Sequence, residues 1–425
     1  MTPHTDVAIV GAGQAGLAVS WHLVRAGVDH VLLDSATPAH AWSTQRWDAF
    51  TLVTPNWHCR LPGWEYRGDD PDGFMTRDEV VAWLDGYVRS FDPPVRTHTT
   101  VREARRHEDG GFLLTLATAD GETVLHADQV VVATGGYHRP VVPPYARAID
   151  PAVQQLHSQE YLAPDRLPDG GVLVVGSGQS GAQIAEDLHL AGRRVHLAVG
   201  SAPRVARTYR GRDCMTWLSD MGLYDTPVQQ YPGGLAAREK TNHYVTGRDG
   251  GRDLDLRRLA AEGMRLHGAL VDAQGSVLEV APTLARSLDA ADAVYNSICA
   301  DIDRHVERHG IDAPPPSRYE PVWTPPEESG VLDLVAEDVT SIVWAIGYRP
   351  DYAWLRVGVF DGSGRPTHTR GVTSVPGLSF VGLPWMHTWG SGRFLGVARA
   401  AEHVAGHVVA QRAAQDRTRP AAVGA

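Results

Sequence analysis

Two stretches of the chain share one pattern of apolar and polar positions. Residues 7–35 (VAIVGAGQAGLAVSWHLVRAGVDHVLLDS) align without a gap on residues 172–200 (VLVVGSGQSGAQIAEDLHLAGRRVHLAVG). Each stretch has a short apolar run, a glycine turn, a segment of helical spacing that ends in Ala-Gly, and a second apolar run. This order predicts strand, turn, helix and strand, so the chain contains two βαβ units.

The pattern predicts three further regions. Residues 93–132 alternate short apolar runs with turn signals, which indicates a small antiparallel meander. Residues 284–309 have helical spacing with apolar residues near one face, and packing in a core explains that face better than a cofactor role. Near the end, a strand (378–381), a glycine-rich turn and a helix (393–409) follow one another.

These elements predict an α/β fold with two Rossmann-like dinucleotide-binding domains and a mainly helical insertion. The first domain is expected over residues 1–165, with the meander, and again over 346–425. The second is expected over 166–345, with the insertion at about 208–326. The apolar runs that end in ATGG (133–136) and AIGY (345–348) look like the crossovers between the domains.

Composition narrows the class of protein. The 425 residues are 43% hydrophobic and 21% charged, which is ordinary for a soluble globular protein, and the net charge of −11 argues against nucleic acid as a partner. No apolar stretch approaches the roughly 20 residues that span a bilayer, and the N-terminus does not read as a signal peptide. We therefore expect a cytoplasmic protein, with no membrane or nucleic-acid partner. The assembly is left open, a homodimer included.

Both βαβ units carry the motif GxGxxG between strand and helix. Its first glycine allows a tight turn, its second lets the backbone approach a pyrophosphate, and its third lets helix and strand pack closely. One such motif is weak evidence, but two in gapless repeats are strong. The glycines are Gly11, Gly13 and Gly16 in the first unit and Gly176, Gly178 and Gly181 in the second.

The end of the second strand indicates which nucleotide each unit holds. Asp34 stands there in the first unit, and an acid at this place accepts hydrogen bonds from ribose hydroxyls, which favours FAD. Val199 stands there in the second unit, followed by Arg204 and Arg207. Without an acid to repel it, a 2′-phosphate could be bound by these arginines, which favours NADPH. A solvated basic turn is the alternative.

Further stretches resemble the class B flavin-dependent monooxygenases, which include the dimethylaniline-type enzymes and the plant indole-pyruvate monooxygenases. The resemblance covers nearly the whole chain apart from the insertion, and it extends to a bacterial subgroup of flavin-dependent oxidoreductases. The stretches that carry it are Trp42 with QRWD (45–48), LVTPNWHCRLPG (52–63), ATGG, GSGQSG, AIGY, KTNHYVTGRDGG (240–251) and LPWMHTWGSGRF (383–394).

The resemblance implies the chemistry. NADPH reduces the flavin, O₂ adds to it as a C4a-(hydro)peroxyflavin, and one oxygen atom passes to a small molecule by N- or S-oxygenation or a Baeyer-Villiger reaction. It also implies roles for residues outside the glycine loops. Asn56, Arg60 and His157 would be catalytic, and Trp42, Arg46, Thr388 and Trp389 would contact the cofactors. Trp385, His387, Trp389 and His243 would wall the substrate pocket.

Each of these roles has a structural alternative. Asn56 follows Pro55 and could be a plain turn residue, His157 could bond backbone in a linker, and the aromatic residues could simply pack. The family fingerprint FxGxxxHxxx(W/Y/F) keeps only its second half, as His157 and Tyr161, with other residues at its Phe and first Gly positions.

Two other functions stay open. A pyridine-nucleotide-disulfide-type NADPH oxidoreductase needs a redox-active cysteine beside the flavin, and Cys59 is the one candidate among Cys59, Cys214 and Cys299. A flavoprotein that only binds nucleotides would need no reactive residue. No cysteine pair, catalytic triad or metal-ligand spacing is present, so no metal is expected.

Overall fold

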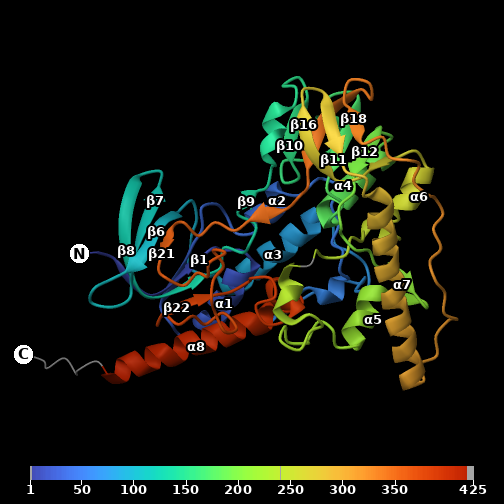
Figure 1. Cartoon of the computed structure of the whole chain (residues 1–425). Helices are drawn as coiled ribbons and strands as arrows, with labels where there is room; N and C mark the ends of the chain where they lie inside the picture. Colours follow the sequence, from blue (N-terminus) through green and yellow to red (C-terminus); the bar gives the residue numbers. More distant parts are fainter. Residues whose placement is uncertain (1, 240, 419–425) are drawn as a thin grey trace, which may run out of the picture.

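The computed structural model describes residues 2–239 and 241–418. Figure 1 shows two lobes, each built on its own sheet, with a helical region beside them. The N-terminus and the long last helix belong to the first lobe, while the middle of the chain forms the second. The predicted α/β fold with two Rossmann-like βαβ units is confirmed, because each unit contributes parallel strands to a sheet of its own.

The first sheet has the strand order β21-β6-β7-β8-β1-β2-β5, with β22 also paired to β8. Strands β1, β2, β5 and β22 are parallel to their neighbours, whereas β6, β7 and the first half of β8 form the predicted antiparallel meander. The strands are β1 (His4–Val10), β2 (His30–Leu33), β5 (Val95–Arg96), β6 (Thr100–Arg106), β7 (Phe112–Thr118), β8 (Gly121–Val132), β21 (Leu355–Arg356) and β22 (Leu378–Phe380).

The second sheet is wholly parallel, in the order β10-β19-β11-β12-β15. Its central strands β11, β12 and β19 are buried apolar runs, as parallel strands covered on both faces usually are. Its strands are β10 (Gln154–His157), β11 (Gly171–Val175), β12 (Val195–Ala198), β15 (Arg265–His267) and β19 (Val339–Trp344).

The expected insertion at 208–326 contains strands as well as helices. Strand β15 is the edge of the second sheet, and β16 and β17 follow it, forming a small antiparallel sheet with β18, which lies just after residue 326. With the sequence Arg-Leu-His, β15 is too short and polar to show an apolar pattern. The smaller strands are β3 (Arg60–Leu61), β4 (Trp64–Glu65), β9 (Arg139–Pro140), β13 (Thr208–Tyr209), β14 (Arg212–Asp213), β16 (Leu270–Gln274), β17 (Val277–Val280), β18 (Val331–Asp333) and β20 (Tyr348–Arg349).

Helices α1 and α8 pack against each other on the first sheet, and α4 covers the second. The long helix α7 buries Leu288, Ala291, Ile302 and Val306, so its apolar face serves the core. The α-helices are α1 (Gln14–Arg25), α2 (His40–Thr44), α3 (Arg77–Phe91), α4 (Gln179–Leu190), α5 (Cys214–Asp220), α6 (Leu256–Ala261), α7 (Leu284–His309) and α8 (Val397–Thr418). The 3-10 helices are η1 (Asn56–His58), η2 (Pro144–Ala148), η3 (Pro164–Arg166), η4 (Gly234–Glu239), η5 (Arg248–Gly250) and η6 (Trp389–Gly392).

The two lobes are joined by the predicted crossovers, which run side by side. Arg139 pairs with Arg349, and Pro140 with Tyr348, in the antiparallel strands β9 and β20.

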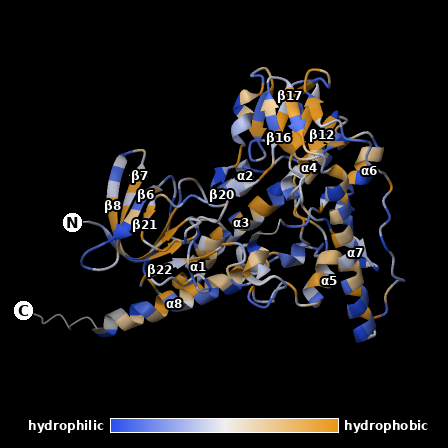
Figure 2. Ribbon diagram, viewed as in Figure 1, coloured by the Kyte–Doolittle hydropathy of each residue, from blue (hydrophilic) through white to orange (hydrophobic). Residues whose placement is uncertain are grey.

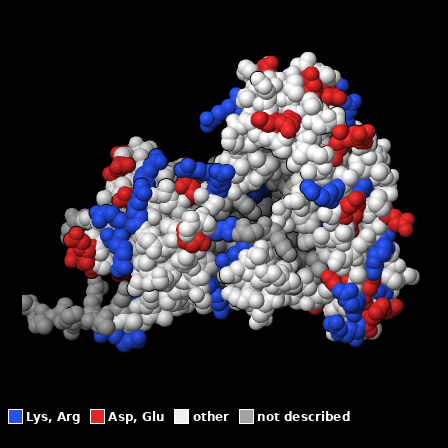
Figure 3. All heavy atoms as spheres, viewed as in Figure 1, with Lys and Arg blue, Asp and Glu red and all other residues white. Residues whose placement is uncertain are grey.

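Hydrophobic residues gather in the strands of both sheets (Figure 2). Figure 3 shows a hollow in the surface where the lobes meet, with basic side chains at its edge. Among the described residues, no helix is long and apolar enough to cross a membrane.

Candidate functional site

The first glycine loop leaves open space where its middle glycine faces outward. A β-carbon at Gly11 would lie 2.7 Å from the carbonyl oxygen of Ala133, and one at Gly16 would lie 2.0 Å from that of Gly11. A β-carbon at Gly13 would meet no atom within 4 Å. The outer glycines are therefore required by protein packing, whereas Gly13 keeps a cradle open at the start of α1, which has no side-chain cap. Unpaired N–H groups at such a helix start suit a pyrophosphate.

The second loop repeats this geometry. A β-carbon at Gly176 would lie 2.8 Å from the Ala345 carbonyl oxygen, and one at Gly181 would lie 1.8 Å from that of Gly176. The nearest atom to a β-carbon at Gly178 is the Thr241 methyl group, at 3.8 Å. Helix α4 also starts without a side-chain cap. The segment after η4 therefore passes beside the second cradle at Thr241.

Asp34 is tied to the first loop by its carboxylate. Asp34 Oδ2 accepts a 2.7 Å hydrogen bond from the Ala12 N–H, and Oδ1 accepts one of 2.9 Å from the Ala36 N–H. Each oxygen keeps a lone pair, and the side chain is half-buried, so it can still accept from a ribose hydroxyl. In the second unit Val199 is buried, and the neighbouring Gly200 N–H donates to Ser177 Oγ instead.

Arg204 and Arg207 are core residues, and the structure does not support their predicted contact with a 2′-phosphate. Each is only 2% exposed. Arg204 forms ion pairs with Asp255 (2.9 Å) and Asp292 (3.3 Å), and Arg207 forms one with Asp213 (2.5 Å). Because carboxylates already neutralise both guanidinium groups away from solvent, neither charge is free for a phosphate.

Trp42 and Arg46 lie where the first loop meets the C-terminal segment. The Trp42 indole N–H donates to Gln14 Oε1 (3.2 Å), and Gln14 Nε2 donates to the carbonyl oxygen of Gly392 (3.0 Å). The Arg46 guanidinium lies 5.2 Å from the centre of the Trp42 ring. Burial lowers the pKa of Arg46, and no carboxylate pairs with it in the described part of the chain. It therefore offers a cation beside the first cradle.

Asn56 and Arg60 have structural partners. Asn56 is buried, its Nδ2 donates to the Asp70 carbonyl oxygen (2.9 Å), and its Oδ1 accepts from the Met75 N–H (2.7 Å). Its amide therefore fixes the loop of residues 70–75. Arg60 is exposed, and its Nε donates to the Trp57 carbonyl oxygen (3.0 Å). Neither contact supports the predicted catalytic role.

His157 fixes the second crossover. Its ring Nε2 lies 3.2 Å from the Gly347 carbonyl oxygen, and its ring packs edge-on against Tyr348. Burial lowers the pKa of the His157 imidazole, which favours the neutral form that can donate to this carbonyl. The backbone-bonding alternative therefore fits His157 better than a catalytic role.

Thr388 and Trp389 form a turn that leads through η6 into α8. The turn is closed by Ser391 Oγ, which accepts from the N–H groups of His387 and Thr388, each at 3.0 Å. The Trp389 ring stacks on Tyr224, with ring centres 4.5 Å apart. A backbone turn before a helix in this place fits the predicted contact with a cofactor, which stays a prediction.

Three of the residues predicted to wall a substrate pocket lie near this turn. Trp385 is buried and packs edge-on against Tyr231, and Trp389 packs in the same cluster. His243 follows Asn242, which accepts from the Trp389 indole at 3.3 Å, and burial lowers the pKa of His243 to about 4. Lys240, the first residue of the same stretch, lies outside the described residues.

His58 was missed from the sequence, where nothing distinguishes it from its neighbours in η1. It is 1% exposed, and within the described ranges neither ring nitrogen has a hydrogen-bond partner. Its ring lies edge-on to Tyr224, with centres 5.8 Å apart, and burial lowers its pKa to about 3. A buried neutral imidazole with an unused donor and an unused acceptor is a candidate contact for a bound molecule.

The three cysteines are buried and unpaired. Burial raises the pKa of Cys59 and of Cys299 to about 12, and it raises that of Cys214 as well. The thiolate is the reactive form of cysteine, so these thiols are unreactive at neutral pH.

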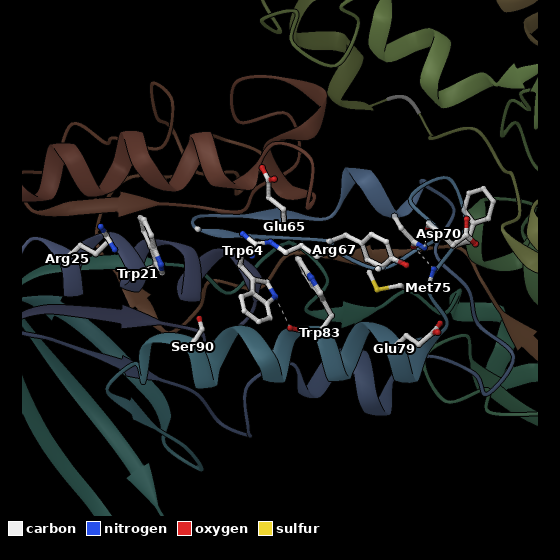
Figure 4. Close-up of a pocket in the computed structure, with 15 residues that line it drawn as sticks. Trp21, Arg25, Trp64, Glu65, Arg67, Asp70, Met75, Glu79, Trp83 and Ser90 are labelled. Atoms are coloured by element: carbon white, nitrogen blue, oxygen red, sulfur yellow. Dashed lines mark hydrogen bonds between the residues drawn. The ribbon is translucent and has the colours of Figure 1, made fainter.

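A cavity of about 720 Å³ opens between α1, the β3–β4 hairpin and α3 (Figure 4). Trp21 and Arg25 lie at one end of it and Asp70 and Met75 at the other, with Trp83 between them. Asn56 also lines this cavity, so the cavity extends to η1, which carries His58.

Comparison with known proteins shows what this arrangement is similar to. Residues 8–220 match the model of the pyridine nucleotide-disulphide oxidoreductase family. An oxidoreductase of Geobacillus kaustophilus named CzcO-like is 29% identical over 94% of this chain and 97% of its own length. A probable indole-3-pyruvate monooxygenase of Arabidopsis thaliana, YUCCA3, is 31% identical over 46% of each chain. A flavin monooxygenase from Stenotrophomonas maltophilia shares the fold, with a TM-score of 0.65 at 20% identity, over 96% of this chain and 99% of that one.

Proposed function

We propose that this chain, which belongs to the pyridine nucleotide-disulphide oxidoreductase family, is an FAD- and NADPH-dependent monooxygenase. Its substrate would be a small molecule that receives one oxygen atom from O₂, at nitrogen, at sulfur or beside a carbonyl group. One observation carries the proposal: two open glycine cradles lie in a fold without a reactive cysteine.

The two cradles fit two dinucleotides. Gly13 and Gly178 each leave room at an uncapped helix start, whereas the other loop glycines are required by packing. Asp34 beside the first cradle suits the ribose of FAD, because each of its carboxylate oxygens keeps a lone pair that can accept from a ribose hydroxyl. Val199 beside the second cradle carries no charge, so a 2′-phosphate is not repelled, and NADPH fits there without the help of Arg204 or Arg207.

The remaining residues support cofactor binding and substrate orientation. When bound, the flavin supplies the redox chemistry, and the protein positions it and keeps water away. Arg46 would neutralise negative charge beside the first cradle, and the Trp389 turn would face the cofactor with its backbone. His58 would hydrogen-bond the bound cofactor or the substrate with its two unpartnered nitrogens.

The thiols distinguish this function from the disulfide reductase that the family name suggests. A reductase passes electrons from flavin to a cysteine whose thiolate is accessible. Cys59 directly follows η1, and it is fully buried with a pKa of about 12. The geometry therefore favours O₂ over a disulfide as the acceptor of electrons.

An isotope experiment tests the proposal. The purified protein would be reduced with NADPH in the absence of O₂ and then exposed to ¹⁸O₂ with a panel of amines, thioethers and ketones. We expect FAD to be released on heating, and one ¹⁸O atom to appear in a product for each NADPH consumed. Reduction of a disulfide such as oxidised glutathione without ¹⁸O in any product would support the reductase, and no NADPH oxidation would support a binding protein.

A further inference from the structure

A second, smaller cavity lies behind the Trp389 turn, and it gathers positive charge. It has a volume of about 180 Å³ and lies between the start of α8, the turn itself, the loop before β22 and the loop after α5. Four basic side chains line it: Arg370, His387, Arg399 and His403. Asp225 is the one acidic residue in its lining.

The charges of this cavity are not balanced. Asp225 forms an ion pair with Arg399, which uses the one carboxylate. Arg370 is exposed, and no ion pair or hydrogen bond involves its side chain within residues 2–239 and 241–418. Burial, followed by the neighbouring Arg370, lowers the pKa of both His387 and His403, so these histidines stay neutral at neutral pH and can donate. One guanidinium charge is therefore left without a partner.

A buried hydroxyl in the same cavity has only a donor left. Ser391 is 2% exposed, and its Oγ already accepts from the N–H groups of His387 and Thr388. A hydroxyl has two acceptor lone pairs and one donor hydrogen, so these two bonds fill its acceptor capacity. The group that completes its bonding must be an acceptor, and an acceptor beside Arg370 and Arg399 is best an anion.

We propose that this cavity binds a small oxyanion, a phosphate or a carboxylate group, held by Arg370 and Ser391 beside the Arg399–Asp225 ion pair. The volume admits several water molecules or one such group. Because Ser391 closes the Trp389 turn, the anion would tighten the turn that leads into α8. The binding of the anion is argued from the cavity alone. Any effect of the anion on a flavin would rest on the proposed function.

Anion binding can be measured on the purified full-length protein in a phosphate-free buffer. Inorganic phosphate, acetate and chloride would be titrated separately at constant ionic strength, with calorimetry and the thermal midpoint as readouts. We expect saturable binding of phosphate or acetate, which distinguishes the two sources of oxyanion, and none of chloride. Arg370→Gln should weaken binding by about tenfold or more, as for loss of a charged hydrogen bond, without unfolding, since Arg370 is exposed.

The matched control is Arg412→Gln, which lies on α8, as Arg399 does, but pairs with Asp6 outside the cavity. It should bind the anion as the unaltered protein does. Ser391→Ala should also weaken binding, and circular dichroism would show whether α8 stays folded. Equal affinities of Arg370→Gln, Arg412→Gln and the unaltered protein, or a response to chloride as large as to phosphate, would overturn the proposal. Because the readouts need neither flavin reduction nor O₂, failure of the oxygenase function would not affect them.

Discussion

Replacing Arg204 with alanine should destabilise the protein and leave its choice between NADPH and NADH unchanged. Arg204 pairs with Asp255 and Asp292 in the core, and its guanidinium carbon lies 3.9 Å from the centre of the Tyr319 ring. The substitution removes one cation and leaves two buried carboxylates behind. Breaking a buried ion pair in this way costs about 3–5 kcal/mol, because the remaining charge has lost its partner.

The structure indicates the lower end of that range. Asp292 keeps a second cation, since Arg257 Nε lies 2.8 Å from its Oδ2, and Asp255 keeps a bond of 3.0 Å from the Arg257 N–H. We therefore expect a loss of about 3 kcal/mol at neutral pH. Burial already raises the pKa of Asp292, and Arg204 opposes that shift. Without Arg204 the pKa of Asp292 rises further, so the destabilisation should shrink as the pH falls and Asp292 takes up a proton.

Denaturation by urea, followed by tryptophan fluorescence, would measure the loss at pH 7 and at pH 5. The matched control is Arg194→Ala, because Arg194 pairs with Asp338 at an exposed site, where such pairs contribute less than about 1 kcal/mol. Steady-state kinetics with both coenzymes would complete the test. The interpretation is refuted if Arg204→Ala is as stable as the unaltered protein and raises the KM for NADPH about tenfold more than that for NADH.

Three further predictions concern the cradle, the thiol and pH. Gly13→Val should abolish flavin absorbance with an unchanged circular dichroism spectrum, since the side chain fills only the cradle, whereas Gly11→Val should unfold the domain against Ala133. Cys59→Ser should keep NADPH turnover within about twofold, because its buried thiol takes no part, and loss of turnover would favour the reductase. The free energy of unfolding should fall as the pH falls from about 6.5 to 4, since burial lowers the pKa of His58 and His196 to about 3 and only the unfolded chain takes up their protons. The slope should be about 1.4 kcal/mol per pH unit for each histidine, His196→Asn should reduce it, and a flat profile would contradict the reasoning.

The glycine turns and the βαβ units could be predicted from the sequence because they depend on short-range packing. Gly11 and Gly16 are required by contacts within their own turn and with the neighbouring strand. Their spacing in the sequence is therefore enough to predict the turn. The same holds for the second loop. The gapless repeat predicted two parallel-stranded sheets, because the strands of a βαβ unit are parallel and are connected with one favoured hand.

The roles of polar side chains could not be predicted in the same way. Arg204 and Arg207 follow a strand, where basic residues often contact phosphate, and their acidic partners Asp255, Asp292 and Asp213 lie elsewhere in the chain. Whether an arginine is free or neutralised depends on such distant partners. Asn56 shows the same difficulty over a shorter distance, because its bonds run to residues 70 and 75 in a loop without a regular pattern.

One contact explains why two distant stretches carry the family resemblance together. Asn242 belongs to the first stretch, and its Oδ1 accepts from the Trp389 indole and from Arg393 Nη2 (3.0 Å), both in the second. Its neighbour Thr241 lies beside the second cradle, while the Gly392 carbonyl oxygen accepts from Gln14 of the first loop. A segment of the insertion thus touches the second loop and, through the C-terminal turn, the first. We therefore expect that a change at Asn242 would disturb the Trp389 turn as well as the segment beside the second cradle.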